Sequence, residues 1–231
     1  VPEENLQHAR RQTLINLASV VLMVLAIVVQ MAEQHGSQPV WHGSDGMARE
    51  LLVLAIILRL GIYPLPGSTK RRWEVYLLSG SAGAFLWLRL ALGSATVLPF
   101  AHWLAPLSWA AIGISALLAA LAPQFSQAVP WLMVNQIAVM LLVPCIAPAA
   151  GARVLALALL QWVLNLALLR MDADLLVAGI RNDMRLQRWA PWPFAVALSS
   201  LAGVPFSLGG SLRWALIQLC WQHGWNNLIP L

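Results

Sequence analysis

The sequence predicts an all-helical membrane protein, a bundle of apolar helices that crosses a lipid bilayer several times. Hydrophobic residues make up 60% of the 231 residues and charged residues only 10%, whereas soluble domains carry roughly 25% charged residues. The mean hydropathy is +0.72. Long runs without charged residues recur along the chain, and about 20 mainly apolar residues are needed to cross the hydrocarbon core. A water-soluble fold could not cover this much apolar surface.

About eight segments have the length and hydropathy expected of a crossing. Residues 1–13 are predicted to form a polar, interfacial segment, and residues 14–231 a single helical bundle. Proline cannot supply a helix N–H, so Pro64 is expected to break the second helix. Pro205 follows Gly203 in the seventh segment, which is therefore expected to be kinked or broken. The expected crossings are residues 14–31, 48–65, 73–93, 102–122, 129–143, 154–169, 191–208 and 211–225.

The placement of the basic residues argues for a membrane orientation and against a nucleic-acid partner. The net charge is +5, but no basic face with interleaved aromatic residues occurs, as nucleic-acid binding would require. With eight crossings, most basic loops share one membrane face, which should be cytoplasmic. This predicts a multi-pass protein of the bacterial inner membrane. The basic residues on that face are Arg10, Arg11, Lys70, Arg71, Arg72, Arg170, Arg181, Arg185 and Arg188.

The sequence contains no motif that indicates an enzyme. It has no HExxH, Walker or GxSxG pattern. Cys145 and Cys220 lie at or inside apolar segments and lack a CxxC spacing, which favours buried thiols over a metal site or a disulfide. We therefore expect no metal and no cofactor, and a non-catalytic membrane subunit rather than an enzyme.

Arg59 and Arg89 are singled out among the charged residues inside expected crossings, where a charge costs about 2.5 to 3.5 kcal/mol. Arg59 lies deep in the second crossing, and Arg89 lies toward the end of the third. Each is a candidate for an ion path, facing a hydrated cavity or a partner's carboxylate. The alternative is that the side chain reaches to the membrane interface.

Uncharged polar residues recur in the fifth and sixth crossings. Asn135, Gln136, Gln161 and Asn165 are candidates for buried polar positions, and the last two share a helix face because they are four residues apart. Hydrogen bonds that hold helices together, at about 1 kcal/mol each, are one interpretation. A hydrated ion path is the other. Small residues from Ser79 to Ala84 would allow close helix packing.

The order of four local patterns resembles the antiporter-like, proton-translocating subunits of respiratory complex I (NADH-quinone oxidoreductase) and of multisubunit cation/proton antiporters. Leu54–Pro66 resembles a family helix that ends in a Pro-containing turn, with Arg59 at the position of a lysine. Ser79–Leu90 and Trp131–Met140 resemble the next two family patterns. Ser199–Gly210, SSLAGVPFSLGG, resembles the family's Leu-Ala-Gly-(Ile/Leu)-Pro-Pro signature. Family members have more helices, so the resemblance covers their central section, and a chain that starts at Val1 fits a processed or partial protein.

The departures from the family pattern concern the residues that carry protons. The resemblance implies a midplane row of Lys, Glu and His, but Gln161 stands near a lysine position, and the lysine-rich turn reads Gln124 to Gln127. Glutamine does not titrate, and a guanidinium such as that of Arg59 holds its proton too tightly to act as a switch. We therefore expect that the chain does not pump protons by the family's route.

Three functional hypotheses follow. The first is a degenerate antiporter-like subunit with a structural or coupling role, bound to other membrane subunits of a larger complex and to lipid. The second is active proton or cation translocation that uses Arg59 with carboxylates of partner chains. The third is an unrelated membrane enzyme or lipid-binding protein whose likeness to antiporters is chance.

Overall fold

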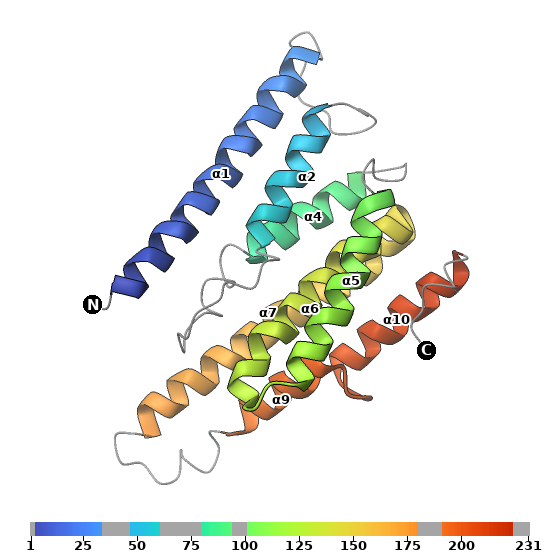
Figure 1. The fold of residues 1–231 in the computed structure, drawn as a ribbon. Coiled ribbons are helices and arrows are strands. Elements are labelled where there is room, and N and C mark those ends of the chain that lie inside the picture. The colour runs from blue at the N-terminus through green and yellow to red at the C-terminus, as the bar shows by residue number, and fades with distance from the viewer. Residues whose placement is uncertain (1–2, 34–46, 61–79, 94–100, 180–190, 224–231) are drawn as a thin grey trace.

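The computed structural model describes residues 3–33, 47–60, 80–93, 101–179 and 191–223, and within these ranges the ordered elements are helices. The helix break expected at Pro64 lies outside these ranges. Eight helices occur in the described residues, and Figure 1 shows them as a layered bundle. They are α1 (Glu3–Glu33), α2 (Met47–Leu60), α4 (Ser81–Gly93), α5 (Ala101–Ala120), α6 (Phe125–Ile146), α7 (Pro148–Gly179), α9 (Pro191–Ala202) and α10 (Leu208–Gln222).

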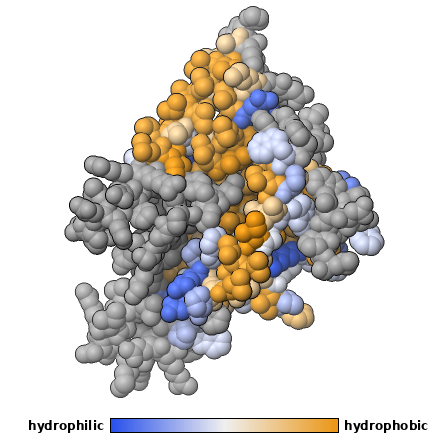
Figure 2. Space-filling model, in the orientation of Figure 1, coloured by the Kyte–Doolittle hydropathy of each residue, from blue (hydrophilic) through white to orange (hydrophobic). Residues whose placement is uncertain are grey.

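Four of these helices are long and apolar enough to cross a membrane, which supports the expected membrane character. Their apolar stretches are Thr13–Ala32, Trp103–Ala120, Gln127–Ile146 and Gly151–Asp172. Figure 2 shows apolar surface over much of the described part of one face. The expected count of about eight crossings is not confirmed, because the described parts of α2, α4, α9 and α10 are each shorter than such a stretch.

The helix α6 forms the centre of the bundle. Within its apolar stretch 83% is buried, against 17% for α1 and 22% for α5. It packs against α5 and α7, while α1 packs against α2 at the far side of the bundle. The outer helices therefore present their apolar side chains to the surroundings, as expected where lipid or a membrane partner replaces water.

Pro144 lies inside α6, although the sequence predicted that the helix would stop before it. Because proline has no N–H, the carbonyl of Met140 lacks its usual helical donor four residues on. The indole Nε1 of Trp87, from α4, donates to the Met140 oxygen at 2.9 Å. Neighbouring helices can satisfy such carbonyls in membrane proteins, and this bond replaces the donor that Pro144 lacks where α6 continues to Ile146.

Small residues allow close contacts between α2 and α4, as the sequence suggested. A Cβ on Gly83 would lie 3.2 Å from the backbone nitrogen of Leu60, so a larger residue would crowd α2 at this point. On the other side of α2, the hydroxyl of Ser19 in α1 donates to the Ala55 carbonyl at 2.9 Å. These contacts join α1, α2 and α4 into one layer.

The helix break expected near Pro205 is present. The helix α9 ends at Ala202 and α10 begins at Leu208; we call residues Gly203–Ser207 the break loop. Figure 1 shows α10 continuing in roughly the direction of α9, whereas the earlier helices alternate in direction. The expected seventh and eighth crossings thus lie end to end along α7, as the two halves of one discontinuous element.

Candidate functional site at the helix break

Three helices meet at a buried chain of amide hydrogen bonds. Gln136 in α6 donates from Nε2 to Oε1 of Gln161 in α7, at 3.1 Å. Gln161 donates from its own Nε2 to the backbone oxygen of Ser200 in α9, at 3.0 Å, and lies 3.4 Å from the Ser200 hydroxyl. All three residues are at most 5% exposed. Gln161 therefore links α6 to the last turn of α9.

This chain of hydrogen bonds lies at the middle of the expected hydrocarbon layer. Gln136 is central in the apolar stretch Gln127–Ile146, and Gln161 is central in Gly151–Asp172. Two neighbouring helices of similar length therefore place their amides at the same depth. In an apolar environment, a pair of amides that satisfy each other avoids the cost of an unpaired polar group.

A second set of bonds centres on Arg213 of α10. Its Nη2 lies 3.1 Å from the Leu201 carbonyl and 3.3 Å from Oδ1 of Asn135. Asn135 in turn donates from Nδ2 to the Ile112 carbonyl at 2.9 Å and to the Ser115 hydroxyl at 3.2 Å. The α9 C-terminus carries the negative end of the helix dipole. The guanidinium therefore caps α9 across the break and connects it to α6 and α5.

Two glycines make this arrangement possible. Gly203 has φ +75°, a conformation that favours glycine, and a Cβ there would overlap the side chain of Arg213. A Cβ on Gly209 would overlap the Ser200 carbonyl and would lie 2.8 Å from Nε2 of Gln161. The break loop thus brings α10 into backbone contact with α9 beside the amide chain.

The start of α10 is capped from within the break loop. The Ser207 hydroxyl accepts from the Gly210 amide at 3.1 Å, as Ser commonly does at a helix N-terminus. Phe206, just before the cap, has φ 70° and a fully exposed side chain. Both sides of the break are therefore built by specific local bonds.

Comparisons of the chain with protein families, with curated proteins and with solved structures found no match.

The structure distributes the predicted site residues unevenly. It brings Gln136 and Gln161 together and buries Asn165, whose Nδ2 has no hydrogen-bond partner within the part of the chain that the structure describes. Arg59 is partly buried on α2, apart from this cluster, and Arg89 is exposed on α4. Of the predicted break residues, Gly203 and Pro205 lie in the break loop.

The sequence did not point to three members of the site, Arg213, Ser200 and Ser115. Arg213 lies among apolar residues of α10 and, like Arg59, is a charged group in an expected crossing, so its insertion cost marks it as a candidate on the same ground. Arg49 lies in the expected second crossing but was not predicted as a site residue, and it is 2% exposed in the first turn of α2. No sequence pattern pointed to Ser200, because its contribution is mainly a backbone oxygen.

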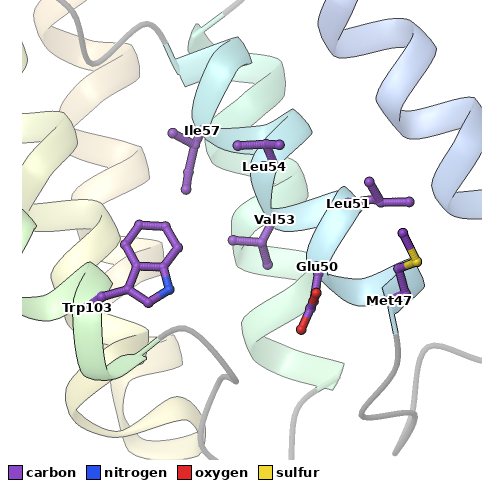
Figure 3. Close-up of a pocket in the computed structure, with 7 residues that line it drawn as sticks. All are labelled: Met47, Glu50, Leu51, Val53, Leu54, Ile57 and Trp103. Atoms are coloured by element: carbon purple, nitrogen blue, oxygen red, sulfur yellow. The ribbon is translucent and has the colours of Figure 1, made fainter.

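A separate pocket of about 210 Å³ opens between α2 and α5 (Figure 3). Glu50 and Trp103 supply its polar groups, and the remaining lining is apolar: Met47, Leu51, Val53, Leu54 and Ile57. Within the described ranges, no three His, Cys, Asp or Glu side chains lie close enough together to hold a metal ion. The pocket offers one carboxylate and no second group for acid–base chemistry with it.

The cluster at the helix break is chemically suited to hold helices rather than to move protons. The side chains that make its bonds are amides, hydroxyls and one guanidinium. Amides and hydroxyls do not titrate in the working pH range, and arginine keeps its proton in proteins. The arrangement fixes the relative positions of α5, α6, α7, α9 and α10.

Proposed function

We propose that the chain is a non-catalytic, structural or coupling subunit of a larger membrane complex. In kind it would resemble the proton-channel subunits of NADH-quinone oxidoreductase and of multisubunit cation/proton antiporters, with a degenerate proton relay. The proposal depends mainly on one observation, the hydrogen-bonded pair Gln136 and Gln161 at midplane depth. Gln161 stands near a position where the resemblance implies a lysine, and both ends of its amide are engaged within the bundle.

The exposure of the outer helices is evidence for an assembly partner in the membrane. The apolar stretches of α1 and α5 are only 17% and 22% buried, so two faces of the bundle are open to lipid or to other subunits. A subunit that lies between other membrane chains needs exposed apolar surface for contact with those chains and with lipid. A bacterial inner membrane is the proposed location, from the distribution of basic residues.

Purification from native membranes in mild detergent tests the first part of the proposal. We expect the chain to co-purify in fixed stoichiometry with other membrane proteins, identified by mass spectrometry. Isolation of the chain by itself, under conditions that keep other membrane complexes intact, would instead favour the hypothesis of a membrane enzyme or lipid-binding protein.

Proton flux tests the second part. In liposomes that contain a pH-sensitive dye, the purified chain should leak protons no faster than empty liposomes, and Gln161→Leu should change nothing. Proton flux that Arg59→Ala abolishes and Arg89→Ala leaves intact would contradict the proposal. That result would favour active translocation through Arg59 and partner carboxylates.

A further inference from the structure

The backbone of the break loop is only partly satisfied by the chain itself. The Val204 amide donates to the Ser199 carbonyl at 3.0 Å, and the Ser207 amide donates to the Val204 carbonyl at 3.1 Å. Pro205 has no N–H. Among the described residues, the amides of Phe206 and Leu208 find no acceptor. Each such group costs several kcal/mol in a hydrocarbon environment.

The depth of the loop makes this cost relevant. Ser200 accepts from Gln161, which is central in the apolar stretch of α7. Gly203 follows Ser200 by three residues, a rise of about 5 Å along a helix, whereas half of the hydrocarbon core is about 15 Å. The break loop therefore lies within the hydrocarbon layer, where irregular backbone is tolerated only against protein or a water-filled cavity.

The side chains around the loop favour protein over water. Val204 is 47% exposed, Leu208 39%, and Phe206 projects fully from the surface. Apolar side chains of this kind are a poor lining for a hydrated cavity. Phe206 also holds a positive φ of 70°, which costs on the order of 1–3 kcal/mol and persists where surroundings impose it. The described residues of the chain do not cover this side chain.

We propose that a transmembrane helix of a partner subunit packs on the break loop. Phe206 would insert between side chains of that helix, and a polar side chain with an acceptor oxygen would receive the unsatisfied loop amides. The inference rests on the proposed function in one respect, namely that the partner belongs to the same membrane complex.

Photo-crosslinking in native membranes tests the contact. The photoreactive residue p-benzoylphenylalanine replaces Phe206 and, as a matched control, Ile114, which is 59% exposed on α5. We expect the adduct from position 206 to map to an apolar segment of a subunit that co-purifies with the unmodified chain. The control should not give this adduct. Equal yields of this partner adduct from positions 206 and 114 would overturn the proposal. So would adducts from position 206 that contain only lipid or a second copy of this chain.

A second variant reports on the energy of the contact. Aromatic anchors at interfaces are often worth about 2 kcal/mol or more, which is about thirtyfold in affinity. Phe206→Ala should therefore weaken recovery of the partner about thirtyfold, while Ile114→Ala should not. Unchanged recovery would overturn the proposal.

A membrane-impermeant maleimide tests the alternative of a water-filled cavity. If it labels the Phe206→Cys variant in the intact complex, water reaches this position and the proposal is overturned. If no subunit co-purifies at all, the proposed function fails; if subunits co-purify but position 206 captures only lipid, this inference alone fails.

Discussion

Arg213 and Asn135 form the bond that ties the two halves of the broken helix to the centre of the bundle. The guanidinium Nη2 lies 3.3 Å from the Asn135 oxygen, and the same nitrogen lies 3.1 Å from the Leu201 carbonyl at the end of α9. The two residues are 78 positions apart in the sequence. This bond makes the geometry of the break depend on α6.

Arg213→Ala should therefore destabilise the protein by about 2 kcal/mol, the upper range for a cation at a helix C-terminus. It also leaves the Asn135 oxygen without this donor. SDS-induced unfolding in bicelles measures the change. Arg89→Ala, at an exposed position, should change stability by less than about 0.5 kcal/mol. Equal effects of the two substitutions would contradict the capping role.

Gly209→Ala should be severe, because its Cβ would overlap the Ser200 carbonyl and crowd Gln161. We expect a loss of about 3 kcal/mol, typical of overpacking against backbone. The matched control is Gly113→Ala in α5, where a Cβ meets nothing within 4 Å. That change should be neutral or stabilising by up to about 1 kcal/mol. Thermal unfolding in detergent compares the two variants, and a tolerated Gly209→Ala would argue against the close approach of α9 and α10.

Trp87→Phe should remove the hydrogen bond that the Met140 carbonyl accepts. The buried oxygen would be left unsatisfied, so we expect the protein to lose about 1–3 kcal/mol of stability. In a Pro144→Ala background the cost should be smaller, because residue 144 would again supply a helical N–H to Met140. A double-mutant cycle on unfolding free energies measures this coupling. Additive effects of the two substitutions would show that the indole bond does not compensate for the proline.

The C-terminus should lie on the membrane face opposite the basic loops if α9 and α10 together make one crossing. Two separate crossings would return it to the cytoplasmic face. Fusions to alkaline phosphatase and to green fluorescent protein at the C-terminus, with a fusion in the basic segment near Arg185 as the cytoplasmic control, separate these outcomes. A fluorescent C-terminal fusion, matching the control, would rule out the single crossing.

The sequence predicted those features that depend on local composition. The apolar stretches of α1, α5, α6 and α7 and the break near Pro205 follow from hydropathy and from proline chemistry. The extension of α6 past Pro144 was not predictable, because it depends on Trp87, which is 53 residues from Met140 in the sequence. The sixth crossing was expected to end at residue 169, yet α7 continues to Gly179.

The site was predicted only in part, because local composition reveals polar residues in apolar runs but not their partners. Gln136 and Gln161 stood out as polar residues in apolar runs, but their pairing depends on how α6 and α7 pack. Ser200 takes part mainly through a backbone oxygen, which every residue has, so no residue type could signal it. Arg213 was visible in the sequence, but its role as a cap requires the break loop to fold back over Gly203.

The Ser200 carbonyl has one more effect, on the orientation of the amides. It can only accept, so Gln161 must turn its nitrogen toward Ser200 and its oxygen toward Gln136, which must then donate. Passing a proton along a hydrogen-bonded file requires each member to reverse its polarity. Here reversal of Gln161 would set its oxygen against the Ser200 carbonyl oxygen, so the surrounding backbone favours one orientation of the amide chain, in which Gln136 donates to Gln161 and Gln161 donates to Ser200.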